Sequence, residues 1–116
     1  MVLVSIGSIE CHGRHMPLGT DTLIPEHLLE KIEKKSDVLI APTIPYGSCP
    51  NFAPYPGTID IDDEVLYQFC RQVFLSLYRH GARKFVFLNG HGGNIKMIQR
   101  LGMEFEDKGC LVAMLN

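Results

Sequence analysis

Tryptophan is absent from the 116 residues, and no apolar run approaches the roughly 20 residues needed to cross a membrane. Basic clusters are missing too: the net charge is −2, and the longest basic stretch, Lys31 to Lys35, is interrupted by Glu33. These absences predict a chain whose partners include neither a membrane nor a nucleic acid. The N-terminal segment also lacks the basic flank and the length of a signal peptide, so we expect a cytoplasmic protein.

The four cysteines contain no C-x-x-C pair, which argues against a zinc ribbon or a redox-active dithiol. In a reducing compartment they are expected to be free thiols. Cys11 differs from the others because it lies inside a cluster of charged residues, where a thiolate ligand or a nucleophile is an open alternative. On an extended segment, however, its side chain would point away from those of Glu10 and His12.

Apolar residues follow strand-like and helix-like patterns in turn along the chain. With 46% apolar and 21% charged residues, the composition is that of a folded protein, and the length predicts a single domain over residues 1–116. The order β-α-β-α-β-α-β predicts an α/β fold, a three-layer sandwich with helices on both faces of a mostly parallel sheet. We expect strands at 2–6, 38–40, 84–88 and 110–115, helices at 22–35, 62–80 and 94–107, and a long irregular loop at 42–57.

Carboxylate and imidazole side chains crowd the segment after the first predicted strand. Glu10 and His12 would share one side of an extended segment, and Asp21 follows a Pro-Leu-Gly-Thr turn that can bring it back toward them. Such a set is a reasonable half of a two-metal site. The alternative is a surface ion pair between Glu10 and His12, with Asp21 merely capping the next helix. His15 could orient a ligand or bind substrate.

A second polar cluster, residues 89–94, follows the third predicted strand. His91 stands there in a glycine turn, where Gly92 and Gly93 let a metal or substrate approach the backbone and Asn94 can cap the next helix. Sites in parallel sheets form beyond the carboxyl ends of the strands, so we expect the two clusters to meet. A phosphate-binding glycine loop is the rival interpretation, although the turn lacks the P-loop lysine.

Together these motifs resemble those of the creatininase (creatinine amidohydrolase) family. The family pattern is Glu-x-His-Gly-x-His-x-Pro-x-x-Thr-Asp, then a Tyr-Gly loop, Phe/Tyr-Pro-Gly-Thr and Asn-Gly-His-Gly-Gly-Asn. The matches run in this order over almost the whole chain, at residues 10–21, 46–47, 55–58 and 89–94. The resemblance implies an α/β hydrolase, usually hexameric, that cleaves a non-peptide or cyclic amide C–N bond with a metal-activated water.

The resemblance also implies roles for particular residues. Glu10, His12, Asp21 and His91 look like the catalytic metal ligands, with Asp21 bridging up to two metals. The metal would be Zn²⁺, with Mn²⁺ or Fe²⁺ as alternatives. The substrate would be a small-molecule amide that the sequence does not name, and we place its contacts at His15, Tyr46, Ser48, Gly92, Gly93 and Asn94.

Two features depart from the family pattern. Family members are twice as long, and in creatininase itself a Glu stands at the position of Gly93 and completes the ligands of the second metal. We therefore expect the chain to correspond to the N-terminal half of a family member, as a fragment, a split subunit or a truncated product. The alternative to an active hydrolase is a non-catalytic subunit that needs a partner chain to complete the site.

Overall fold

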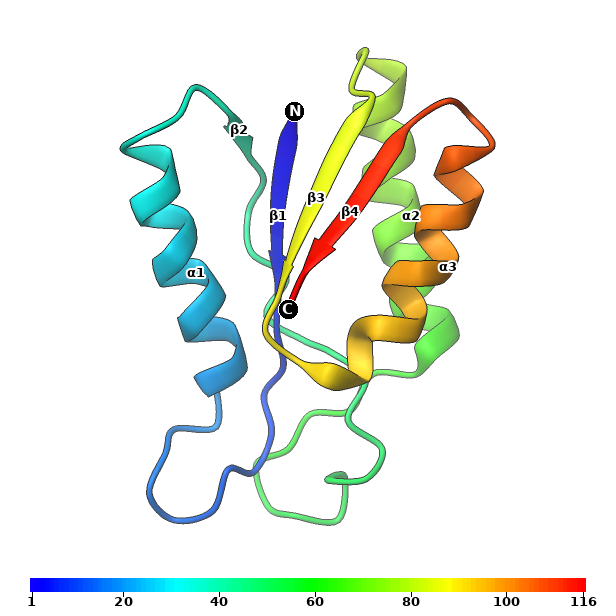
Figure 1. Cartoon of the computed structure of the whole chain (residues 1–116). Coiled ribbons are helices and arrows are strands. Elements are labelled where there is room, and N and C mark those ends of the chain that lie inside the picture. Colours follow the sequence, from blue (N-terminus) through cyan, green and yellow to red (C-terminus); the bar gives the residue numbers. More distant parts are fainter.

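The computed structural model describes residues 1–116 and contains the expected alternation of strands and helices (Figure 1). The longest helix begins after Asp62, whose carboxylate accepts hydrogen bonds from the backbone N–H groups of Glu64 and Val65. None of the helices combines the length and the apolar character that crossing a membrane requires. In chain order the elements are β1 (Val2–Ile6), α1 (Thr20–Glu33), β2 (Leu39–Ile40), α2 (Asp63–Arg79), β3 (Lys84–Asn89), η1 (Gly92–Asn94), α3 (Ile95–Glu106) and β4 (Leu111–Leu115).

The four strands form one parallel sheet in the order β2-β1-β3-β4. β1 pairs with β3 over its full length, from Val2 opposite Phe85 to Ile6 opposite Asn89, so the two strands end at the same level. From β1 the chain moves outward to β2, and from β3 it moves outward to β4 in the opposite direction. The topological switch point therefore lies between the carboxyl ends of β1 and β3, which is where open α/β sheets bind their ligands.

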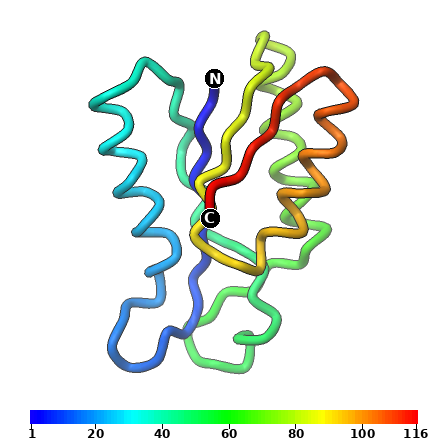
Figure 2. Tube along the Cα trace, in the orientation of Figure 1, coloured from blue at the N-terminus to red at the C-terminus, as the bar shows by residue number.

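Helices cover both faces of the sheet, which confirms the predicted three-layer α/β fold (Figure 1, Figure 2). On the face covered by α2 and α3, Phe74 stacks on Phe85 and Phe87 with ring centroids 4.4 and 5.0 Å apart, and Phe105 meets Phe74 edge-on. All four rings are fully buried, and each buries on the order of 150–250 Å². On the opposite face α1 packs against β1, and the α1 residue Leu29 is buried.

The segment between β2 and α2 crosses beneath the carboxyl ends of the strands (Figure 2). It is irregular, as predicted for residues 42–57, but it is tied to the chain that leaves β1. Isolated bridges join Ile44 to Ile6 and Ile59 to Ile9. This segment therefore forms a fixed wall of the space below the sheet.

The helix caps predicted for Asp21 and Asn94 are not formed. α1 begins after Gly19 and α3 after Asn94, both without a side-chain cap. Thr22, in the first turn of α1, donates its hydroxyl to the Ser8 carbonyl instead. Buried carbonyl groups of an irregular segment need donors, and here polar side chains from the helix ends supply them.

The four cysteines are free, as predicted. Cys70 and Cys110 are buried in the core beside the phenylalanine cluster. Burial raises the pKa of the Cys70 thiol to about 12. These two side chains therefore pack as small apolar groups.

Candidate metal centre

Two carboxylates and two histidines converge at the switch point. Glu10 and His12 follow β1, Asp21 lies in the first turn of α1, and His91 follows β3. Asp21 stands between the imidazoles, with Oδ1 2.9 Å from His12 Nε2 and Oδ2 3.0 Å from His91 Nδ1. A carboxylate that turns one oxygen to each histidine is placed to bridge two cations.

Glu10 is the second carboxylate of the cluster, and only 5% of the residue is exposed. Its Oε1 lies 3.8 Å from His12 Nε2, and its Oε2 lies 3.2 Å from His91 Nδ1. Oε2 is nevertheless a buried atom without a hydrogen-bond partner. Leaving a charged acceptor in that state is costly, and a cation beside Oε2 would remove the cost. The donor set therefore fits a divalent metal.

Backbone carbonyl groups hold both imidazole rings. His12 Nδ1 lies 3.0 Å from the Glu10 carbonyl oxygen, and His91 Nε2 lies 2.9 Å from the Ser48 carbonyl oxygen. Because a carbonyl oxygen only accepts, these partners assign the ring proton to His12 Nδ1 and His91 Nε2. In each neutral ring the other nitrogen then turns a lone pair toward carboxylate oxygens. Such an arrangement needs a cation or a further proton between the opposing lone pairs.

Two pKa shifts reflect this crowding. Burial alone lowers the pKa of His12, but the hydrogen bond to the Glu10 carbonyl and the negative charges of Asp21 and Glu10 outweigh it, so the pKa is raised. Burial, with the Glu10 carboxylate, raises the pKa of the Cys49 thiol to about 12. Metal ligands must lose their protons, so metal binding here competes with protonation.

Close backbone packing brings the ligands together. A Cβ on Gly90 would overlap the carbonyl oxygen of Asp21, so only glycine lets the first turn of α1 rest on the end of β3. The buried hydroxyl of Ser8 donates to Asp21 Oδ2 over 3.2 Å and holds the carboxylate in place. These contacts explain how Asp21 reaches His91, which is 70 residues away in the sequence.

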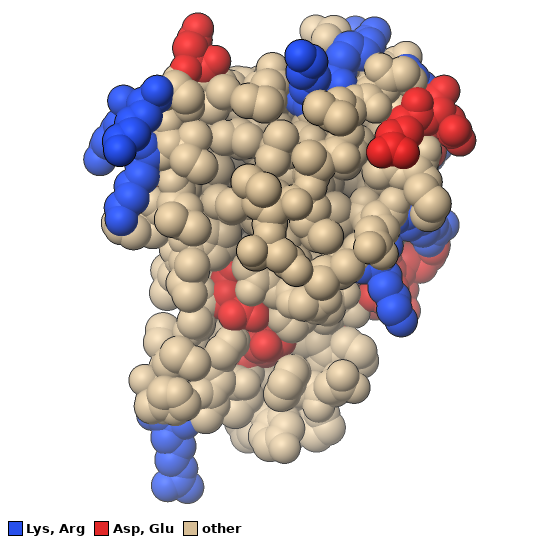
Figure 3. All heavy atoms as spheres, viewed as in Figure 1, with Lys and Arg blue, Asp and Glu red and all other residues tan.

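A polar pocket of about 480 Å³ opens beside the ligand cluster. Figure 3 shows acidic side chains in a hollow below the strand ends, whereas Lys and Arg lie mostly at the margins of this view. A recess lined by negative charge favours a cation. Residues in its wall include Glu10, Asp21, Ser48, Cys49, His91 and Lys96.

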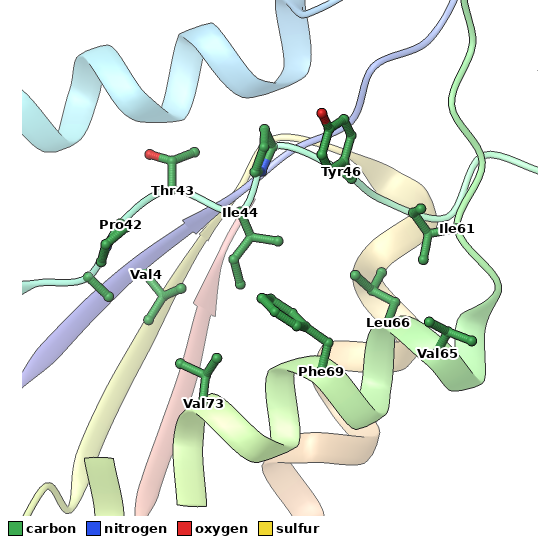
Figure 4. Close-up of a pocket in the computed structure, with 12 residues that line it drawn as sticks. Val4, Pro42, Thr43, Ile44, Tyr46, Ile61, Val65, Leu66, Phe69 and Val73 are labelled. Carbon is green, nitrogen blue, oxygen red and sulfur yellow. The ribbon is translucent and has the colours of Figure 1, made fainter. Parts of the chain in front are cut away.

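A larger hollow lies away from these ligands. It is an apolar groove of about 610 Å³ between α2 and residues 41–46, lined by side chains such as Ile44, Ile61 and Phe69 (Figure 4). Almost no polar group faces it, so it carries no apparent chemistry. The smaller polar pocket is therefore the candidate active site.

The residues predicted to contact substrate are distributed over several places. Gly92 and Gly93 line the polar pocket, as does Ser48, which is only 5% exposed. Tyr46 lies at one end of the apolar groove instead (Figure 4). His15 is exposed on the loop between β1 and α1, and the structure brings neither Tyr46 nor His15 to the cluster of Glu10, His12, Asp21 and His91.

Asn94, another residue predicted to shape the pocket, is fully buried behind it. Its side chain donates to the Gly7 carbonyl over 3.0 Å and accepts the Ser48 N–H over 3.2 Å. The amide thus ties the end of β1 to the wall of the pocket. The structure gives Asn94 a supporting position beside the ligands.

Sequence reasoning missed two residues that contact the ligands, Ser8 and Cys49. Cys49 Sγ lies 3.6 Å from His91 Nε2, and Ser8 supports Asp21 as described. Ser8 lies two residues before Glu10, which was a usable signal on an extended segment. No spacing rule connects Cys49 with His91, because the two residues are 42 positions apart.

Comparisons with known proteins bear on the family of this chain. The family model Creatininase (Creatinine amidohydrolase) matches residues 1–115. A mycofactocin precursor peptide peptidase of Mycolicibacterium smegmatis is 35% identical over 108 residues, which cover 84% of this chain and 42% of the relative. A creatinine amidohydrolase of Pseudomonas putida is 29% identical over 103 residues, which cover 84% of this chain and 40% of the relative.

Solved structures show the same fold. A crystal structure of creatinine amidohydrolase (creatininase) superposes with a TM-score of 0.83 at 27% identity, covering 99% of this chain and 49% of that chain. A manganese creatininase structure superposes with a TM-score of 0.84 at 27% identity, covering 99% of this chain and 49% of that chain. The chain thus spans about half the length of the proteins it matches. On the family match over residues 1–115, this chain belongs to the creatininase family.

Proposed function

We propose that this chain carries the metal centre of a hydrolase that cleaves a non-peptide or cyclic amide C–N bond by means of a metal-activated water. One observation carries the proposal: a buried carboxylate oxygen of Glu10 has no hydrogen-bond partner and lies 3.2 Å from His91 Nδ1. The names of the relatives support amide hydrolysis, since two of them are an amidohydrolase and a peptidase.

In this proposal the four clustered side chains are the catalytic ligands. Glu10, Asp21 and His91 would hold one cation, and His12 with Asp21 would supply part of a second position. The carbonyls of Glu10 and Ser48 keep the rings turned toward the site. A divalent metal bound there would acidify water and polarise the amide carbonyl of the substrate.

The substrate class is a small-molecule amide that enters the polar pocket. Gly92 and Gly93 supply an uncrowded rim, and Ser48 and Asn94 fix the wall. Lys96, also in the wall, is placed to attract a negatively charged part of a substrate. Contacts from Tyr46 and His15 require a second polypeptide or a rearranged loop, because both residues lie away from the ligands in this structure.

Zinc is the proposed metal, with manganese or iron as alternatives, because mixed imidazole and carboxylate ligands suit all three. Solved creatininase structures include a zinc–zinc type and a manganese type, which supports up to two metals in one site. Four free cysteines fit a reducing compartment, so we propose a cytoplasmic location.

Metal stoichiometry by elemental mass spectrometry is the direct test. We expect one or two metals per chain in freshly purified protein, and loss of metal in His12→Ala and His91→Ala. His27→Ala is the matched control, because His27 lies on α1 with 65% of its side chain exposed. Folded wild-type protein without metal, even after loading with zinc or manganese, would overturn the proposal. A panel of cyclic and linear amides then identifies the substrate.

A second candidate role, as a subunit that needs a partner chain, is favoured by exposed apolar surface. The groove of Figure 4 is flanked by Val65 and Phe69, which are 61% and 54% exposed. β4 adds Leu111 and Leu115, which are 56% and 55% exposed on an edge strand. We propose that residues 1–116 form one domain of a homo-oligomer. Light scattering tests this, and a stable monomer with full metal content would contradict it.

A further inference from the structure

Cys49 is buried in the wall of the polar pocket, with 2% of the residue exposed. Its Sγ lies 3.6 Å from His91 Nε2. Hydrogen bonds hold the chain on either side of the thiol: the Cys49 N–H donates to Asp60 Oδ1 over 2.6 Å, and the Ser48 N–H donates to Asn94 Oδ1 over 3.2 Å. The thiol is therefore held in a preset position against the His91 ring, on the side of Nε2, whereas His91 Nδ1 faces Glu10 Oε2.

A second observation at the same place points to a cation. Glu10 Oε2 is buried without a hydrogen-bond partner, and 7% of the Glu10 side chain is exposed. Ligand atoms of Glu10, Cys49 and His91 all lie within 4.8 Å of one another, and all three residues are buried. The other such group, Glu10 with His12 and Asp21, is only partly buried. The more enclosed half of the site is thus the half that contains sulfur.

Residue 93 is a glycine and supplies no side chain beside His91. A Cβ at residue 93 would overlap the Ser48 carbonyl oxygen and approach His91 Nε2 to 2.5 Å. The backbone of residues 48–49 therefore fills the space that a side chain at position 93 would occupy. The side chain that this segment does present beside His91 is the Cys49 thiol.

We propose that Cys49 is a metal ligand, binding as a thiolate to the cation held by Glu10 and His91. The sulfur–metal bond forms as the S–H proton leaves to solvent, with no change in oxidation state. The inference rests on the proposed function in one respect, namely that Glu10 and His91 hold a metal. Adding a soft thiolate to oxygen and nitrogen ligands favours zinc, cobalt or cadmium over manganese.

Cobalt substitution tests the proposal without measuring activity. We expect Co²⁺ added to the metal-free chain to give a near-ultraviolet sulfur-to-metal charge-transfer band together with the visible bands of bound cobalt. Cys49→Ser should lose the charge-transfer band and keep the visible bands. Cys11→Ser is the matched control, because Cys11 follows Glu10 directly but belongs to neither ligand group; it should keep both.

Two outcomes would overturn the proposal, and they separate it from the proposed function. Wild-type protein that binds Co²⁺ without a charge-transfer band still has a metal site, but Cys49 is not in it. If the wild-type protein binds no metal, both this proposal and the proposed function are wrong. The wild-type spectrum decides the question even if Cys49→Ser does not fold. In folded Cys49→Ser, the preference for Zn²⁺ over Mn²⁺ should also fall by about tenfold or more.

Discussion

Glu10→Gln should make the metal-free protein more stable while it weakens metal binding. The substitution keeps the shape of the side chain and replaces one oxygen by an N–H donor. In the structure, Oε2 is buried without a hydrogen-bond partner, 3.2 Å from Nδ1 of His91. The amide can donate to that nitrogen, so a repulsive contact becomes a hydrogen bond.

The size of the effect follows from the cost of the unpaired group. A buried acceptor without a partner costs about 1–3 kcal/mol, and more if it is charged. We expect the free energy of unfolding of the metal-free chain to rise by about 1–2 kcal/mol, which raises Tm by roughly 4–8 °C. Wild type gains about 2.7 kcal/mol from metal at one hundred times its Kd. Glu10→Gln should gain less than half of that, so added metal should cancel most or all of the variant's stability advantage.

Urea denaturation with chelator and with zinc measures both effects. Glu30→Gln is the control, because 62% of the Glu30 side chain is exposed on α1, and its stability should change by less than about 0.5 kcal/mol. A metal-free Glu10→Gln protein less stable than wild type would refute the argument from the unpaired oxygen. If zinc stabilised Glu10→Gln as much as it stabilises wild type, Glu10 would not be a metal ligand.

Three further predictions concern packing and charge. Gly90→Ala should cost about 3 kcal/mol of stability in urea titrations and reduce the metal content, because the new Cβ overlaps the first turn of α1. Gly92→Ala is the control: its Cβ meets no atom within 4 Å, so this variant should fold normally. Phe74→Ala, at a fully buried ring, should cost about 3–5 kcal/mol, and a loss below about 1 kcal/mol would contradict the core described above. Burial raises the pKa of Glu104, but the Arg71 guanidinium, with Nε 2.8 Å from Oε2, outweighs it and the pKa is lowered. Glu104→Gln should therefore destabilise the chain by about 1 kcal/mol at pH 7. That difference should disappear as the pH falls below the ordinary glutamate range and through the lowered pKa of Glu104, because the carboxylate contributes stability only while it is ionised.

Element types and their order were predictable because they depend on local periodicity. The apolar run of Phe85 to Leu88 and the helical spacing around Phe105 both lie in the elements expected for them. Boundaries were less predictable: α1 spans Thr20–Glu33 rather than 22–35. The expected caps failed because the Asp21 carboxylate pairs with His12 and His91, and the Asn94 amide bonds to the Gly7 carbonyl. Local rules cannot weigh such partners, since they arrive from elsewhere in the chain.

For the site, the sequence by itself determined which residues stand at the carboxyl ends of β1 and β3, and parallel pairing then places Glu10 and His91 near one another. Only the tertiary structure decided which nitrogen of each ring faces the carboxylates, which oxygen of Glu10 lacks a partner, and that Cys49 lies beside His91. The physical reason is that these features depend on packing between segments far apart in sequence. Glycine at position 90 and the bridged loop below the sheet set those distances, and no local propensity encodes them.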